Sequence, residues 1–87
     1  MKRSLPDIFR RENEAAMDLV PVQSSNLAAV GYESNEGVLE VHFKNGAVYQ
    51  YLNVPVLVHQ GLMVASSKGG YLDRFVKKAG YRYVRVH

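Results

Sequence analysis

The sequence predicts an α+β domain with a three-stranded antiparallel meander, followed by two short helices and a final short strand. Three observations favour this fold class. Apolar and polar residues alternate over residues 38–44, as they do in a half-buried strand. Asn45-Gly46 follows directly and is the strongest short-range signal for a hairpin. After Pro55 the apolar residues recur at helical rather than strand spacing.

The meander is predicted from alternation and from turn chemistry. Its strands are expected at residues 27–33, 38–44 and 47–52. The first two are separated by SNEG, four residues that all favour turns. In the second strand Leu39, Val41 and Phe43 should share one face, because successive side chains of a strand point to opposite sides.

Two helices and a strand are expected to complete the domain. The first helix is predicted over residues 54–66, with Pro55 in its first turn. Gly61 lies inside this helix, and we expect it to allow close packing against the sheet. The second helix is predicted over residues 70–78 and is followed by a glycine, which often ends a helix. Residues 81–86 alternate again and predict the final strand.

The first part of the chain differs from the remainder. Residues 1–19 carry a thin apolar stripe through a charged segment, which predicts an N-terminal extension in the form of a helix or a mobile arm. The folded domain is expected to span residues 20–87. Its small size leaves room for only one hydrophobic core.

Composition and charge restrict the classes of function. The chain has 87 residues, 47% of them hydrophobic, and no cysteine, so neither disulfides nor a thiolate metal site are expected. There is no apolar run of the roughly 18 residues that a membrane span needs, and the charged start does not resemble a signal peptide. We therefore expect a cytoplasmic protein that does not bind membranes.

Positive charge is concentrated near the C-terminus. The formal net charge is +3, and from Lys68 onward six basic residues accompany the single acid Asp73. A basic end predicts a nucleic acid or an acidic protein surface as partner. The alternative is a solvated helix face next to an exposed edge strand, where basic residues discourage aggregation.

The central question is the direction of Tyr49 and Tyr51. A two-residue Asn45-Gly46 loop in a type I′ turn would place both tyrosines opposite the apolar face, exposed beside His42 and Lys44. A three-residue loop with a glycine bulge would instead pair Val41 with Tyr49 and Leu39 with Tyr51, which buries the rings. The two-residue loop is favoured because it gives the cleaner apolar face.

An exposed tyrosine pair next to cations is typical of single-stranded RNA binding, because bases stack on the rings while cations contact phosphates. The alternative is that the rings only cover half-buried sheet surface. The leading hypothesis is a small non-catalytic module that binds single-stranded RNA or tRNA. The residues proposed for it are Tyr49, Tyr51, His42, Lys44, Lys68, Lys77, Lys78 and Arg82.

Other candidate chemistry is weaker. Ser67, Gly69 and Gly70, beside Lys68, resemble an anion site at a helix N-terminus, although an ordinary helix cap with a flexible turn is the favoured explanation. The three histidines, at positions 42, 59 and 87, lack the spacing of metal ligands, so we expect no metal and no cofactor. A small hydrolase using His59 and Ser66 is a third class of function, which the sequence disfavours.

Residues 20–86 resemble the KTSC domain family, named for a domain at the C-terminus of some lysyl-tRNA synthetases. The matching pieces include AVGYE, LEVHFKNG, the Tyr49–Tyr51 pair, SSKGGYL and the closing YRY. The resemblance implies a short module that also occurs alone in small bacterial and phage proteins. The synthetase association suggests RNA binding. The alternative is a protein–protein interaction module of bacterial or phage origin that uses the sheet face or the N-terminal arm.

Overall fold

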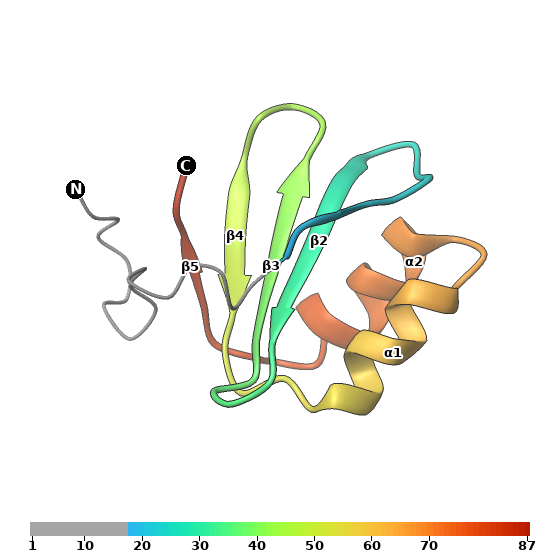
Figure 1. The fold of residues 1–87 in the computed structure, drawn as a ribbon. Coiled ribbons are helices and arrows are strands. Elements are labelled where there is room, and N and C mark those ends of the chain that lie inside the picture. The colour runs from blue at the N-terminus through green and yellow to red at the C-terminus, as the bar shows by residue number, and fades with distance from the viewer. Residues whose placement is uncertain (1–17) are drawn as a thin grey trace.

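The computed structural model describes residues 18–87, which form an antiparallel sheet with helices packed on one of its faces (Figure 1). The strands follow one another in the sheet in chain order. They are β1 (Val20–Pro21), β2 (Leu27–Glu33), β3 (Val38–Phe43), β4 (Val48–Tyr51) and β5 (Tyr83–Arg85). The helical segments are α1 (Val56–Val64), α2 (Lys68–Leu72) and the π-helical η3 (Asp73–Lys77).

The predicted fold class is confirmed, with one additional strand. The meander of β2, β3 and β4 is followed by the helices and by β5, as expected. The two residues of β1 pair with β2 and carry too little pattern to be recognised in the sequence. The arm expected over residues 1–19 lies mostly outside the described residues, which begin at Asp18.

The turn between β3 and β4 has three residues rather than the favoured two. The Phe43 N–H donates to the Ala47 carbonyl at 2.9 Å, and the Gly46 N–H donates to the Phe43 carbonyl at 2.9 Å. Gly46 has φ 99°, whereas among the described residues Asn53 is the only non-glycine with positive φ. Asn45 therefore avoids the left-handed region that a type I′ turn would require, and its Oδ1 accepts the Ala47 N–H.

This turn reverses the expected direction of both tyrosines. The register pairs Leu39 with Tyr51 and Val41 with Tyr49, so the rings share the face of the apolar residues. The favoured placement of the tyrosines opposite that face is wrong, and the bulged alternative is correct. Asn-Gly fits both turns, and a shift of one residue exchanges the two faces of a strand.

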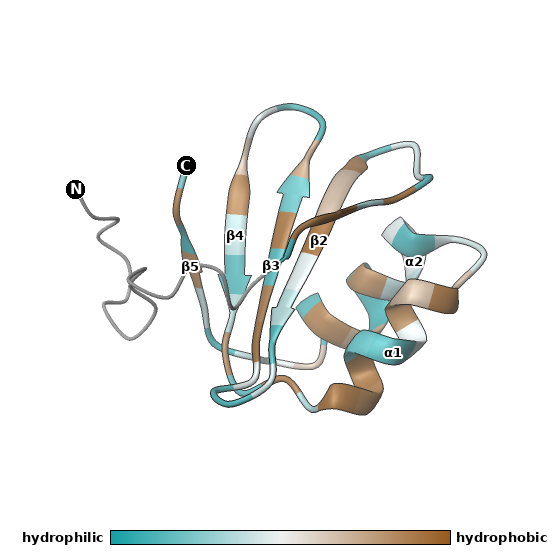
Figure 2. Ribbon diagram, in the orientation of Figure 1, coloured by the Kyte–Doolittle hydropathy of each residue, from teal (hydrophilic) through white to brown (hydrophobic). Residues whose placement is uncertain are grey.

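The hydrophobic core lies between the sheet and the helices. Apolar and polar residues alternate along β3, which supplies its apolar side to this core (Figure 2). Leu62 of α1 and Leu72 of α2 are almost completely buried against the sheet. The buried cluster comprises Leu27, Val30, Leu39, Val41, Tyr51, Val54, Leu62, Leu72 and Val76.

Gly61 contacts a neighbouring helix rather than the sheet, contrary to expectation. A Cβ atom at this position would overlap the Tyr71 hydroxyl oxygen. Such an approach is possible only without a side chain at position 61, or after Tyr71 moves. Tyr71 in turn packs on Phe75, with ring centroids 4.7 Å apart. Gly61 thus allows α1 to approach α2 closely.

The second helical segment begins earlier than predicted and changes its winding. Ser67 caps α2, because its Oγ accepts the Gly70 N–H at 3.2 Å. The chain then continues without interruption from α2 into η3, where the Lys78 N–H donates to the Asp73 carbonyl five residues earlier. Gly80 follows with φ 90°, which provides the expected turn toward β5.

His59 of α1 fastens the helix to β2 by aromatic stacking. Its ring lies on Tyr32, with centroids 4.6 Å apart and planes inclined by 7°. The Tyr32 hydroxyl donates to the Val54 carbonyl, which fixes the ring at the start of the helix. Burial disfavours the charged imidazolium and lowers the pKa of His59 below its ordinary value of 6.5.

The lowered pKa predicts a pH-dependent contribution to stability. The contribution of His59 should be complete above pH 6.5 and should be lost as the pH falls through the lowered pKa, because the unfolded chain binds the proton first. A His59→Phe variant keeps a ring on Tyr32 but cannot titrate. In urea unfolding followed by circular dichroism, the native protein should lose more stability than this variant between pH 7.5 and pH 5. Equal losses would contradict the assignment.

Candidate functional site

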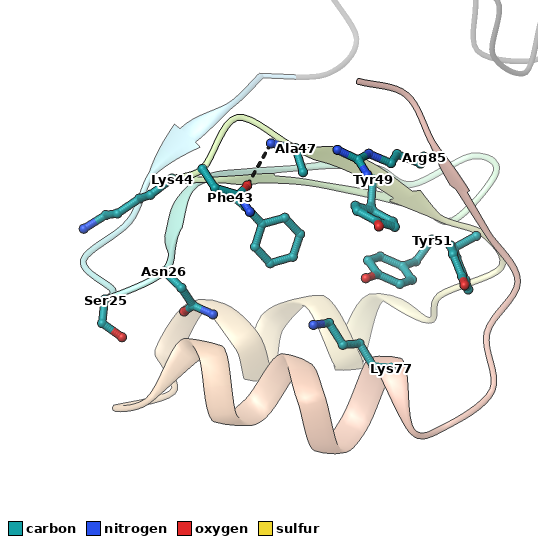
Figure 3. A pocket seen from close by; sticks show the side chains of 11 residues that line it. Ser25, Asn26, Phe43, Lys44, Ala47, Tyr49, Tyr51, Lys77 and Arg85 are labelled. Carbon is teal, nitrogen blue, oxygen red and sulfur yellow. Dashed lines mark hydrogen bonds between the residues drawn. The ribbon is translucent and has the colours of Figure 1, made fainter.

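A groove runs between the helices and the sheet at its β4–β5 side (Figure 3). We call it the aromatic groove, and its volume is about 730 Å³. Figure 3 shows the Phe43, Tyr49 and Tyr51 side chains pointing from the sheet toward the helices, while Lys77 reaches toward them from η3. The lining residues are Ser25, Asn26, Phe43, Lys44, Asn45, Ala47, Tyr49, Tyr51, Lys77, Tyr83 and Arg85.

The four aromatic rings of the groove form one continuous surface. Tyr83 lies 5.7 Å from Tyr49 and 5.8 Å from Tyr51 between ring centroids, tilted by 43° and 44°. Phe43 stands nearly perpendicular to Tyr49, at 88° and 5.8 Å. Such tilted and edge-to-face arrangements are the favoured geometries of aromatic pairs. The rings therefore form a concave wall.

Exposure increases along this wall from the core to the sheet edge. Tyr51 is 3% exposed and belongs to the core, Tyr49 is half-buried, and Tyr83 is 60% exposed. Burial, followed by the neighbouring Tyr49 and Tyr83, raises the pKa of Tyr51 to about 12. The Tyr51 hydroxyl therefore remains neutral at physiological pH, and the floor of the groove carries no negative charge.

Two cations lie on the rings. The Lys77 Nζ is 5.4 Å from the centre of the Phe43 ring, and the Arg85 Cζ is 5.8 Å from the centre of the Tyr49 ring. Both distances are within the range of cation–π attraction. Arg85 Nε also donates to the His87 carbonyl at 3.1 Å, which leaves other guanidinium N–H groups for a ligand. The combination of open ring surface and positive charge suits a planar ligand that carries negative charge.

The structure brings together only part of the predicted nucleic-acid site. Tyr49, Tyr51, Lys44 and Lys77 line the groove, although the Lys44 side chain points away from the rings (Figure 3). Lys78 pairs with Asp73 at 3.1 Å instead. Arg82 is exposed and is not among the groove residues.

His42 is separated from the tyrosines by the sheet itself, because the observed register places both tyrosines on the face of Leu39 and Val41 and leaves His42 on the opposite face. There its Nε2 lies 2.7 Å from Glu40 Oε2. Gln50 Nε2 donates to Glu40 Oε1 at 2.6 Å, and both Glu40 and Gln50 are buried. The expected placement of His42 beside the tyrosines is wrong, since it depended on the two-residue turn.

Sequence reasoning missed three of the groove's main residues: Phe43, Tyr83 and Arg85. Phe43 was expected to lie in the core. The alternation of YRYVRV already placed residues 83 and 85 on one face of the last strand. The sequence did not show which strand residues 83 and 85 pair with. In the structure Tyr83 pairs with Tyr51 and Arg85 pairs with Tyr49, which brings both to the groove.

The predicted anion-binding residues line a second, smaller pocket of about 420 Å³. Ser67, Gly69 and Gly70 meet Lys68 there, as expected. The Gly70 N–H is engaged by the Ser67 cap, and the Lys68 Nζ donates to the Ala65 carbonyl at 2.9 Å. These groups already have partners within the protein.

The remaining candidates are dispersed. Within residues 18–87, no three histidine or acidic side chains gather where they could hold a metal ion. His59 stacks on Tyr32, whereas Ser66 lines the smaller pocket, to which His59 does not contribute. In the same part of the chain, no helix has both the length and the apolar character to cross a membrane.

Comparisons with known proteins agree with the predicted resemblance. The family model described as KTSC domain matches residues 23–83. An uncharacterized protein of Stutzerimonas stutzeri is 41% identical over 70 residues, which cover 80% of this chain and 99% of that protein. A lysine–tRNA ligase of Trichormus variabilis is 37% identical over 62 residues, which are 71% of this chain and 11% of the ligase.

A solved structure supports the same assignment. The crystal structure of a KTSC domain protein from Yersinia pestis matches with a TM-score of 0.74 and 38% sequence identity. The alignment covers 83% of this chain and all of that one. This chain belongs to the KTSC domain family.

Proposed function

We propose that this domain binds single-stranded RNA, including unpaired segments of tRNA, through the aromatic groove. The observation that carries the proposal is the exposed ring of Tyr83, which continues into Tyr49 beside the cations Lys77 and Arg85. Proteins bind unpaired bases by stacking them on aromatic rings and hold the backbone with basic residues. The groove offers both kinds of contact within one cavity.

The buried position of Tyr51 changes the expected mode of binding. A ring that is 3% exposed cannot offer an open face to a base, so Tyr51 serves as the floor. Tyr83 and the accessible part of Tyr49 take the stacking role that the sequence suggested for Tyr49 and Tyr51. The site is thus a cleft between sheet and helix, and not the open sheet face that was expected.

The relatives give independent support. Lysine–tRNA ligases of Trichormus variabilis and Nostoc sp. contain a segment 37% and 36% identical to this chain. Their names state that they act on tRNA, and the shared segment is 11% of each ligase. A role in RNA contact would explain why one module occurs both within these enzymes and in small proteins.

The salt dependence of binding tests the proposal. Each contact between a cation and a phosphate of single-stranded RNA contributes about 0.7 to the slope of log K against log salt concentration. Lys77→Ala should therefore weaken binding of a single-stranded oligoribonucleotide and reduce this slope by about 0.7, as measured by fluorescence anisotropy at several salt concentrations.

The neighbouring Lys78 provides a matched control, because it pairs with Asp73 outside the groove. Lys78→Ala should leave the slope nearly unchanged. Equal effects of the two substitutions would indicate non-specific attraction to a basic helix. Absence of any RNA binding by the native protein would reject the proposal.

A further inference from the structure

We propose that the aromatic groove is a site for one nucleotide carrying a terminal phosphate, and that it binds a free nucleoside monophosphate. This inference rests on the proposed function and specifies the chemical unit that the groove accepts. Its basis is the shape of the aromatic wall together with the placement of two cations.

The aromatic wall has room for one base rather than a stack of bases. Tyr83 is inclined by 43° to Tyr49, and Phe43 stands at 88° to Tyr49. A run of stacked bases needs parallel exposed rings, whereas Tyr83 and Phe43 are inclined to Tyr49, and the ring that is nearly parallel to Tyr49, Tyr51, is buried. A single planar ring can lie on Tyr83 with its edge toward Tyr49, and Phe43 stands edge-on beyond Tyr49. The groove volume of about 730 Å³ is within the usual range for small-molecule sites.

The two cations match the charge of a terminal phosphate. Lys77 extends from η3 and Arg85 from β5, so positive charge reaches the groove from the helical side and from the sheet (Figure 3). A phosphate monoester carries a charge of about −1.5 to −2 at pH 7, while an internal phosphodiester carries a single negative charge. Two cations at one small groove favour the monoester.

The rings also discriminate against other ligands. Lys77 and Arg85 already lie over the Phe43 and Tyr49 rings, so a cationic ligand would meet like charges. A bare phosphate would leave the exposed Tyr83 ring unused. A neutral nucleoside would leave both cations without a counter-charge. The strongest ligand should therefore combine a base with a phosphate.

The test is a titration of the isotope-labelled full chain with AMP, adenosine and inorganic phosphate, followed by amide chemical shifts. AMP should shift the amides of residues 43–51 and 83–85, and should bind at least tenfold more tightly than adenosine or phosphate. Equal affinity for AMP and phosphate would reduce the site to an anion site, and equal affinity for AMP and adenosine would reduce it to an apolar one. Either result overturns the inference.

Paired substitutions in the last part of the chain locate the phosphate contact. Arg85→Ala should weaken AMP at least fivefold and leave adenosine unchanged, whereas Arg82→Ala, outside the groove, should leave AMP unchanged. Equal weakening by both substitutions would overturn the assignment. The amide spectrum of each variant shows directly whether the fold is intact.

Failure here is distinguishable from failure of the proposed function. If single-stranded RNA binds and AMP does not, the one-nucleotide site is rejected while RNA binding stands. If AMP binds in the groove and RNA does not, the monophosphate site stands and the proposal of RNA binding is rejected.

Discussion

Tyr51→Ala is expected to lower the free energy of unfolding by about 3 to 5 kcal/mol, the cost of removing a buried aromatic ring. Tyr51 is 3% exposed and contacts the rings of Tyr49 and Tyr83, so its loss opens a cavity at the floor of the groove. The effect is a large share of the stability of a domain this small. Urea unfolding followed by circular dichroism measures it.

Tyr51→Phe is the matched control. It retains the ring and removes only the hydroxyl, so its cost should be less than about 1.5 kcal/mol. If the alanine variant were as stable as the phenylalanine variant, Tyr51 would not be part of the core, and the register of β3 and β4 would be in doubt.

Tyr83→Ala should have the opposite effect to Tyr51→Ala: the stability of the fold should be preserved, and the affinity for RNA should fall. Its ring is 60% exposed, so little core packing is lost. Loss of one stacked base costs about 1 to 3 kcal/mol, which corresponds to about a 5- to 150-fold weaker affinity for single-stranded RNA. Fluorescence anisotropy measures the affinity, and thermal unfolding measures the stability.

Tyr83→Phe tests whether the ring itself is responsible. Stacking does not need the hydroxyl, so this variant should bind RNA nearly as well as the native protein. Native affinity in the alanine variant would remove Tyr83 from the site. A similar loss in both variants would indicate that the hydroxyl, not the ring surface, contacts the ligand.

The sequence predicted the fold better than the site because the fold depends on local signals. Only a few residues are needed to recognise the alternation in β3 and the turn at Asn45-Gly46, and both features predicted the meander correctly. The sequence does not determine the type of turn, because Asn-Gly is compatible with both the two-residue and the three-residue loop. The difference lies in the backbone angle of Asn45, and it decides the direction of Tyr49 and Tyr51.

The site depends on contacts between distant segments. Lys77 lines the groove from η3, and a reading of the sequence at the regular 3.6-residue period does not predict this π-helical segment. Tyr83 and Arg85 reach the groove because β5 pairs with β4, although the helices separate these two strands in the sequence. The sequence could therefore identify candidate side chains, but it could not show which of them lie together in the folded domain.

The short strand β5 makes part of the groove sensitive to local unfolding. It has three residues, and among the strands of residues 18–87 it lies at the edge of the sheet and pairs only with β4, yet it contributes both Tyr83 and Arg85. Short edge segments fray at a lower energetic cost than global unfolding. Detachment of this strand would remove Tyr83 and Arg85 from the groove while the core persists. By thermodynamic reciprocity, whatever occupies the groove must hold this strand in place, so occupancy and local order rise and fall together.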